Sequence, residues 1–125
     1  MTILVIEPER KPVIAEVNGS LDSMQKVVGG FIEASYPFDE QVALICNEEG
    51  KLNNLPLNRA LYHPETNKMY DIVSGTFFIC GAKVEEDSFS SLTQEQIQTY
   101  TKMFQQPELF LFINGTVVAL PMECL

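Results

Sequence analysis

The apolar residues of this chain come in short β-prone runs, and each run is bounded by turn residues. Thr2–Ile6 stops before Pro8, and Val42–Cys46 runs into the turn sequence Asn-Glu-Glu-Gly. Thr76–Cys80 is rich in phenylalanine and isoleucine and follows Gly75, so it is predicted to lie centrally in a sheet. Runs of this length predict short strands rather than long helices.

Two segments carry helix-start signals instead. Ser20 precedes apolar residues at three- and four-residue spacing, and glycine at position 29 provides a stop. Thr93 followed by Gln96 three residues later is a capping box, and Pro107 closes that segment. The sequence therefore predicts two helices.

The last part of the chain carries the strongest hairpin signal. Leu109–Ile113 and Thr116–Leu120 flank an Asn-Gly pair, which favours a two-residue turn. Leu52–Tyr62 contains Pro56 and is predicted to be a helical turn or an irregular loop. Together the patterns predict an α+β fold over residues 1–125 as a single domain. We expect a mostly antiparallel sheet with two helices on one face and a C-terminal β-hairpin.

Charge and cysteine content restrict the function classes. The net charge is −9, from 17 acidic and 8 basic residues, so a phosphate backbone would be repelled. The three cysteines, Cys46, Cys80 and Cys124, show no CxxC spacing, which favours reduced thiols in a cytoplasmic protein. No apolar run is long enough to span a membrane. We expect no direct nucleic-acid partner and no membrane partner.

Conventional catalytic and metal-binding patterns are weak in this chain. His63, the one histidine, lies beside a proline in a polar loop and has no evident nucleophile to activate. Scattered cysteines and a loop histidine make a poor zinc ligand set. We therefore expect no catalytic residues, no metal and no cofactor.

Arg59 is the polar residue that most needs an explanation, because it lies among apolar neighbours and is one of two arginines. One interpretation is structural: the guanidinium caps backbone carbonyls or pairs with an acid such as Asp71. The other is functional: a planar fork binds a ligand carboxylate or phosphate. In that case Asn58 and Asn54 add hydrogen-bonding groups. Tyr62 and Tyr70 can stack on the ligand or form hydrogen bonds with it.

Several blocks occur in the order seen in one known family. Val28–Glu33, Leu55–Arg59 and Gly75–Ile79, followed by the capped segment Ser91–Glu108, resemble an uncharacterised family of small proteins. Phages and mobile elements of Gram-positive bacteria carry members of that family. The resemblance covers roughly residues 28–108, and the C-terminal hairpin has no counterpart in it. It implies no activity, but it implies an accessory gene of the kind that often acts against host defence.

We therefore expect a non-enzymatic protein in the host-cell cytoplasm that counters host defence by binding. One mode sequesters a small nucleotide-derived signal through Arg59, Asn58, Asn54, Tyr62 and Tyr70. In the alternative mode, an acidic surface acts as a protein inhibitor or nucleic-acid mimic and occupies a basic site on a host defence nuclease or other protein.

Two features discriminate between these modes. A pocket that gathers the arginine and the asparagines would favour sequestration. A continuous acidic strip over Glu48–Glu49 and Glu85–Asp87 would favour protein inhibition. An enzyme is the third option, and a homo-oligomer is left open.

Overall fold

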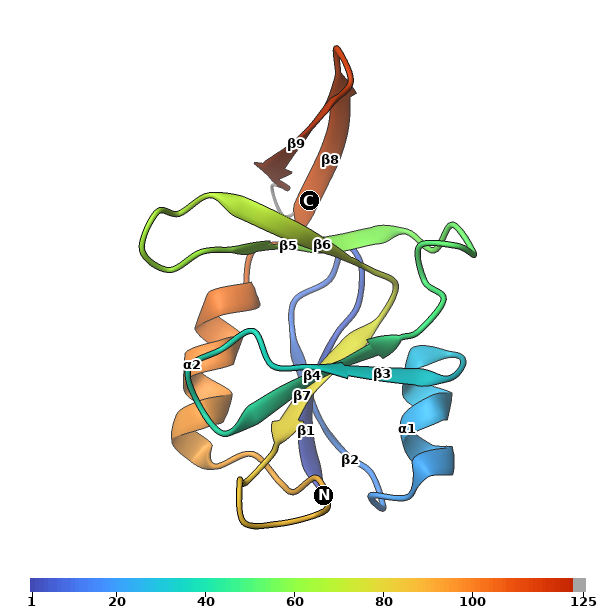
Figure 1. The fold of residues 1–125 in the computed structure, drawn as a ribbon, viewed down its shortest axis with the longest axis vertical. Coiled ribbons are helices and arrows are strands. Elements are labelled where there is room, and N and C mark those ends of the chain that lie inside the picture. Colours follow the sequence, from blue (N-terminus) through green and yellow to red (C-terminus); the bar gives the residue numbers. More distant parts are fainter. Residues whose placement is uncertain (123–125) are drawn as a thin grey trace.

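The structure is a computed structural model that describes residues 1–122. It contains nine strands and two helices, labelled in Figure 1. In chain order they are β1 (Thr2–Ile6), β2 (Val13–Glu16), α1 (Leu21–Val28), β3 (Ile32–Ser35), β4 (Val42–Asn47), β5 (Leu57–Tyr62), β6 (Met69–Ser74), β7 (Phe77–Gly81), α2 (Gln94–Phe104), β8 (Glu108–Ile113) and β9 (Thr116–Pro121). The predicted α+β class, with a mostly antiparallel sheet and a C-terminal hairpin, is confirmed.

The centre of the molecule is a five-stranded sheet with the order β2-β1-β7-β4-β3. Every neighbouring pair in it is antiparallel, including β3 and β4, which are joined by a short link. β7 is the middle strand and is buried along its whole length, as its phenylalanine-rich sequence predicted.

The two helices lie on opposite faces of this sheet, so the prediction that they share one face is wrong (Figure 1). Met24 and Val28 of α1 pack with Ile45 and its neighbours on one face. Tyr100 and Phe104 of α2 pack on the other face. Alternate residues of a strand point to opposite faces, so an unbroken apolar run needs cover on both sides. The runs in β4 and β7 are of this unbroken kind.

The helix ends follow the predicted chemistry. The Ser20 side chain accepts a hydrogen bond from the Ser23 backbone N–H, and Gly29 closes α1 with a φ of 77°. Thr93 and Gln96 form the complete capping box at the start of α2. These local signals could be read from the sequence because every partner lies within a few residues of the cap.

The segment Leu52–Tyr62 differs from the prediction of a helical turn or irregular loop. Its second half, Leu57–Tyr62, is strand β5, which pairs antiparallel with β6 through a register that shifts twice. The shifts interrupt the period of two that marks a strand in sequence. This two-stranded sheet covers the α2 side of the core through Leu61 and Val73.

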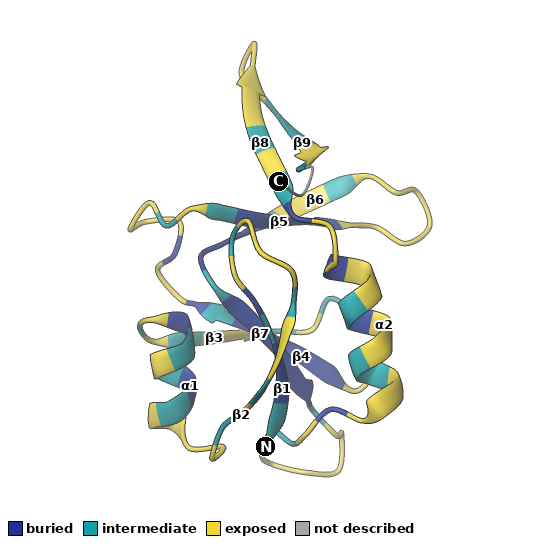
Figure 2. Cartoon of the chain, turned by 180° about the vertical axis from the view of Figure 1, so that it is seen from behind, coloured by how far each residue is buried: buried dark blue, intermediate teal, exposed yellow. Residues whose placement is uncertain are grey.

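The C-terminal hairpin β8–β9 projects from the body beyond the β5–β6 sheet (Figure 1). Figure 2 shows the contrast in burial: the central strands are dark blue, whereas most of the hairpin is yellow or teal. Among residues 1–122, no helix is long and apolar enough to cross a membrane.

Candidate functional site

A cavity of about 570 Å³ lies between α2, the β5–β6 sheet with its turn, and the link from β3 to β4. Its walls are mainly aromatic and apolar, and three carboxylates also line it. The aromatic residues are Phe38, Tyr62, His63, Tyr70, Tyr100 and Phe104, and the carboxylates are Asp39, Glu40 and Glu108. The volume falls within the range of small-molecule sites.

Arg59 borders this cavity, but it is only 1% exposed. Nε and Nη2 donate to the carbonyl oxygen of Phe104 at 3.2 and 3.0 Å. Nη1 donates to the carbonyl and side-chain oxygens of Asn58 at 3.3 and 2.9 Å, and Nη2 also reaches the carbonyl of Arg10 at 2.6 Å. A guanidinium has five N–H groups, and these contacts use all of them. The geometry is that of a structural clamp.

The carboxylate that acts on the charge of Arg59 is Glu108, not the expected Asp71. Burial lowers the pKa of the Arg59 guanidinium, and the nearby Glu108 carboxylate opposes that shift. Arginine stays protonated at neutral pH even so. The suggested pairing with Asp71 is wrong, because Asp71 accepts a hydrogen bond from Lys51 at 2.7 Å instead.

The two candidate asparagines do not line the cavity. Asn58 is fully buried, and its Nδ2 donates to the carbonyls of Ile6 and Gly75, each at 2.8 Å. Asn54 is exposed in the turn before β5, with a left-handed φ of 55° that asparagine tolerates well. A pocket that gathers the arginine and both asparagines, the feature that would favour sequestration, is not formed.

The two candidate tyrosines do line the cavity. Tyr62 donates a hydrogen bond from its hydroxyl to Glu108 Oε2 at 2.9 Å. Burial, together with Glu108, raises the pKa of Tyr62 to about 12. Tyr70 stacks on His63, with ring centroids 4.5 Å apart and planes inclined at 29°. His63, predicted to have a surface role, thus forms part of the same aromatic wall.

Two carboxylate–tyrosine contacts at this site were not predicted from the sequence. Glu108 accepts hydrogen bonds from the backbone N–H of Ala60 at 2.9 Å and from the hydroxyl of Tyr62. Tyr100 of α2 is buried, and its hydroxyl donates a hydrogen bond to Glu40 Oε1 at 2.6 Å. One signal was available: a tyrosine in a buried stripe needs a hydrogen-bond partner for its hydroxyl.

A family model described as a domain of unknown function, DUF3846, matches residues 1–105. The chain belongs to the DUF3846 family. No match was found among curated proteins or among solved structures. The match ends just after α2, so the Arg59 clamp lies inside the DUF3846 region, whereas Glu108 and the β8–β9 hairpin follow it.

The thiols of this DUF3846 chain are poorly suited to nucleophilic chemistry. Burial, with the Glu33 carboxylate next in effect, raises the pKa of Cys46 to about 11. Burial raises the pKa of Cys80 to about 12. Both thiols are therefore protonated at neutral pH, and the thiolate is the reactive form. Cys124 lies outside the described residues. Among residues 1–122, no three His, Cys, Asp or Glu side chains gather as a metal site.

The acidic segments of the chain do not form one strip. Glu48–Glu49 directly follows β4, whereas Glu85–Asp87 comes after β7. Since β4 and β7 are antiparallel, with Val42 opposite Gly81, the two segments leave opposite ends of the sheet. A continuous acidic surface over both segments is therefore absent from the described chain.

Proposed function

We propose that this DUF3846 chain is a non-enzymatic binding protein that holds a small heteroaromatic ligand of the nucleoside type in the 570 Å³ cavity. The observation that carries the proposal is the combination of stacking surfaces and hydrogen-bond acceptors in one cavity. Tyr70 and His63 present a flat wall, and the Glu40 and Glu108 carboxylates lie on the same lining.

The aromatic wall suits a planar ring because bases stack on tyrosine and histidine side chains with little dependence on sequence. Tyr70 is 44% exposed, so its ring is accessible from solvent. The His63–Tyr70 stack orders this wall without a bound ligand. A ring that enters the cavity can therefore bind to a surface that is already arranged.

The carboxylates suit the amino and imino hydrogens of a base, because an ionised carboxylate accepts hydrogen bonds. Tyr100 engages Oε1 of Glu40, which leaves Oε2 as an acceptor on an exposed side chain. No lysine among the described residues lines the cavity, and Arg59 has used its donors within the protein. The ligand is therefore recognised through its base, and any phosphate points toward solvent.

Sequestration of a nucleotide-derived immune signal is the biological role we propose for this binding. The proposed setting is the cytoplasm of a Gram-positive host cell that carries a phage or mobile element. That setting rests on the resemblance described from sequence. The alternative of an acidic inhibitor draws no support from geometry, because Glu48–Glu49 and Glu85–Asp87 lie apart.

The test is calorimetric titration of the chain with the four ribonucleosides and their 5′-monophosphates. Tyr70→Leu should weaken nucleoside binding about 5- to 150-fold, because a base–aromatic stack contributes about 1–3 kcal/mol. Tyr36→Leu is the matched control, because Tyr36 is 63% exposed and does not line the cavity. Glu40→Gln should weaken binding by about tenfold or more, since a hydrogen bond to a charged group contributes about 1.5–3 kcal/mol.

Two results would overturn the proposal. One is the absence of binding by every nucleoside. The other is equal weakening by Tyr70→Leu and Tyr36→Leu. A monophosphate that binds far more tightly than its nucleoside would contradict recognition through the base. It would show that the phosphate is bound despite the carboxylates that line the cavity.

A further inference from the structure

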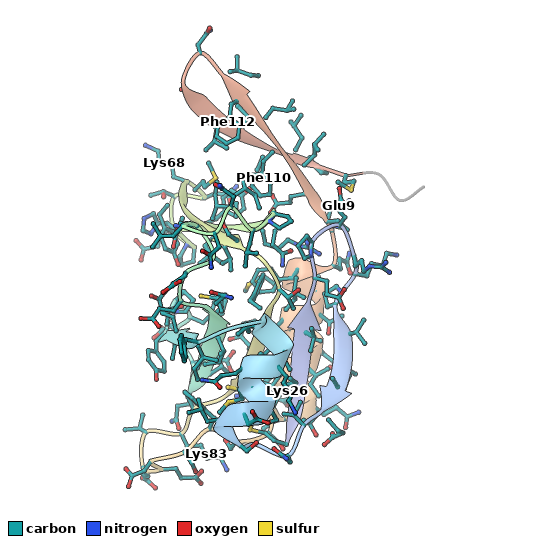
Figure 3. All side chains as sticks on the ribbon, turned by 90° about the vertical axis from the view of Figure 1, so that its right-hand side faces the viewer. Glu9, Lys26, Lys68, Lys83, Phe110 and Phe112 are labelled. Atoms are coloured by element: carbon teal, nitrogen blue, oxygen red, sulfur yellow. The ribbon has the colours of Figure 1, made fainter. Side chains whose placement is uncertain are left out.

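The β8–β9 hairpin has two faces with different surroundings. In the hairpin register Leu109 pairs with Leu120, and Leu111 pairs with Val118, so their side chains share a face. We call this the aliphatic face: Leu109, Leu111, Ile113, Val118 and Leu120, with Thr116 opposite Ile113 at its far end. Phe110 and Phe112 lie on the other face, which overlooks β6 (Figure 3). Phe112 borders a groove of about 340 Å³ there, together with Ile72.

The aliphatic face is exposed although its residues are apolar. Leu109 and Ile113 are 45% and 52% exposed, and Leu111 and Leu120 are 39% and 41% exposed. Single exposed leucines are ordinary, but a contiguous apolar patch marks an interaction surface. Residues 109–121 also contain no charged residue, although the whole chain has a net charge of −9.

The hairpin as it stands lacks the support that such an element normally needs. An isolated pair of strands is marginally stable in water unless a third strand or another layer packs against it. Edge strands in soluble proteins are usually protected by charged residues or by prolines within the strand. β8 and β9 have Glu108 and Pro121 at their ends near the body, but Leu109–Leu120 between them has neither, which is typical of a strand pair that is covered in the functional state.

The total surface area of the chain is larger than expected for a monomer of its mass. The chain exposes 7985 Å², whereas a monomer of its 14.1 kDa mass is expected to expose about 6,700 Å². The excess is roughly 1,300 Å² over the whole chain, which is more than the about 800 Å² per partner of a standard interface. The projecting hairpin is the element that departs most from a compact shape (Figure 1).

We propose that the aliphatic face is a homodimer interface, in which the hairpins of two copies pack face to face about a two-fold axis. An isologous contact needs a self-complementary surface, and a row of leucine, isoleucine and valine without charge meets that requirement. Two chains of charge −9 repel each other, and an uncharged hairpin that stands away from the body keeps the acidic surfaces apart. The same negative charge disfavours an anionic membrane as the partner.

Sedimentation velocity tests the proposal with the full chain at about 1 to about 200 µM, a range that covers micromolar association. We expect a species of twice the 14.1 kDa chain mass that dissociates on dilution. Leu111→Glu should weaken association at least about 100-fold, because the two-fold axis brings two new carboxylates together. Leu52→Glu, the same exchange at a leucine that is 82% exposed in the β4–β5 link, should leave the dimer intact.

Thermal unfolding checks that each variant is folded. If Leu111→Glu does not fold, Leu120→Glu on the other strand replaces it as the test of the interface. A wild-type chain that is monomeric at every concentration overturns the proposal. A dimer that survives both hairpin substitutions in folded protein overturns it as well. A monomer that binds neutral phosphatidylcholine vesicles would assign the face to lipid instead, and that too would overturn it.

Discussion

The guanidinium of Arg59 donates two hydrogen bonds to the backbone carbonyl of Phe104, the last residue of α2. This carbonyl is among the last four of the helix, which have no intrahelical partner. The positive charge also lies at the negative end of the helix dipole. Arg59, on strand β5, therefore caps the C-terminal end of α2. The residue that the sequence singled out as a candidate ligand-binding group has a structural role at a helix end.

Arg59→Lys should destabilise the fold by about 2–4 kcal/mol, because lysine keeps the charge but loses the planar fork and two of the donors. Urea unfolding followed by circular dichroism measures the change. Arg10→Lys is the matched control at the other arginine, whose side chain is 75% exposed and should give a change within about 0.5 kcal/mol. Equal stability of the two variants would refute the clamp.

Asn58→Ala should cost about 3 kcal/mol or more, since the carbonyls of Ile6 and Gly75 both lose a donor in a buried site. Asn54→Gly is the control, because glycine readily takes the φ of 55° found there. The free energies of unfolding of the two variants can be compared directly. A small loss at Asn58 would mean that water replaces the amide.

Phe104→Ala should lower the free energy of unfolding by about 3–5 kcal/mol, as expected for truncation of a buried ring. Phe104 is 4% exposed and meets Phe77 edge-on at 5.4 Å between centroids. The next residue back, Met103, is 52% exposed, so Met103→Ala should have little effect on stability. Melting temperatures that fall equally in both variants would contradict the burial of Phe104.

Stability should fall as the pH rises from about 9 toward 12. The pKa of Cys46 is raised from 9.0 to about 11 and that of Cys80 from 9.0 to about 12, and both folded thiols stay neutral where the unfolded thiols ionise. The unfolded state then binds fewer protons than the folded state, so the free energy of unfolding decreases with pH. This contribution is fully present below pH 9.

Urea unfolding between pH 8 and 11 under reducing conditions measures that slope, which Cys80→Ala should make shallower. A slope that is unchanged in Cys80→Ala would show that this thiol is not shielded in the folded state.

The sequence predicted most elements because their signals are local. The capping box at Thr93 and the glycine at position 29 act within one helical turn. The apolar, β-prone sequence of β7 is itself enough to predict a buried strand. Strand β5 was not predicted because it contains the polar residues Asn58 and Arg59. Their side chains are buried only because they donate hydrogen bonds to carbonyls up to 52 residues away in sequence. No local pattern reports such partners, and the same holds for the carboxylate of Glu108 at the cavity.

The Arg59 clamp also has a kinetic consequence. Its acceptors on Phe104 and Arg10 lie 45 and 49 residues away along the chain, so the complete clamp cannot form until β5, α2 and the β1–β2 link have been brought together. Closing loops of this length costs entropy before any contact repays it, so we expect the clamp to form after the transition state for folding. Loss of the fork should then accelerate unfolding and leave the folding rate almost unchanged. The Arg59 side chain would thereby contribute to the kinetic stability of the native protein.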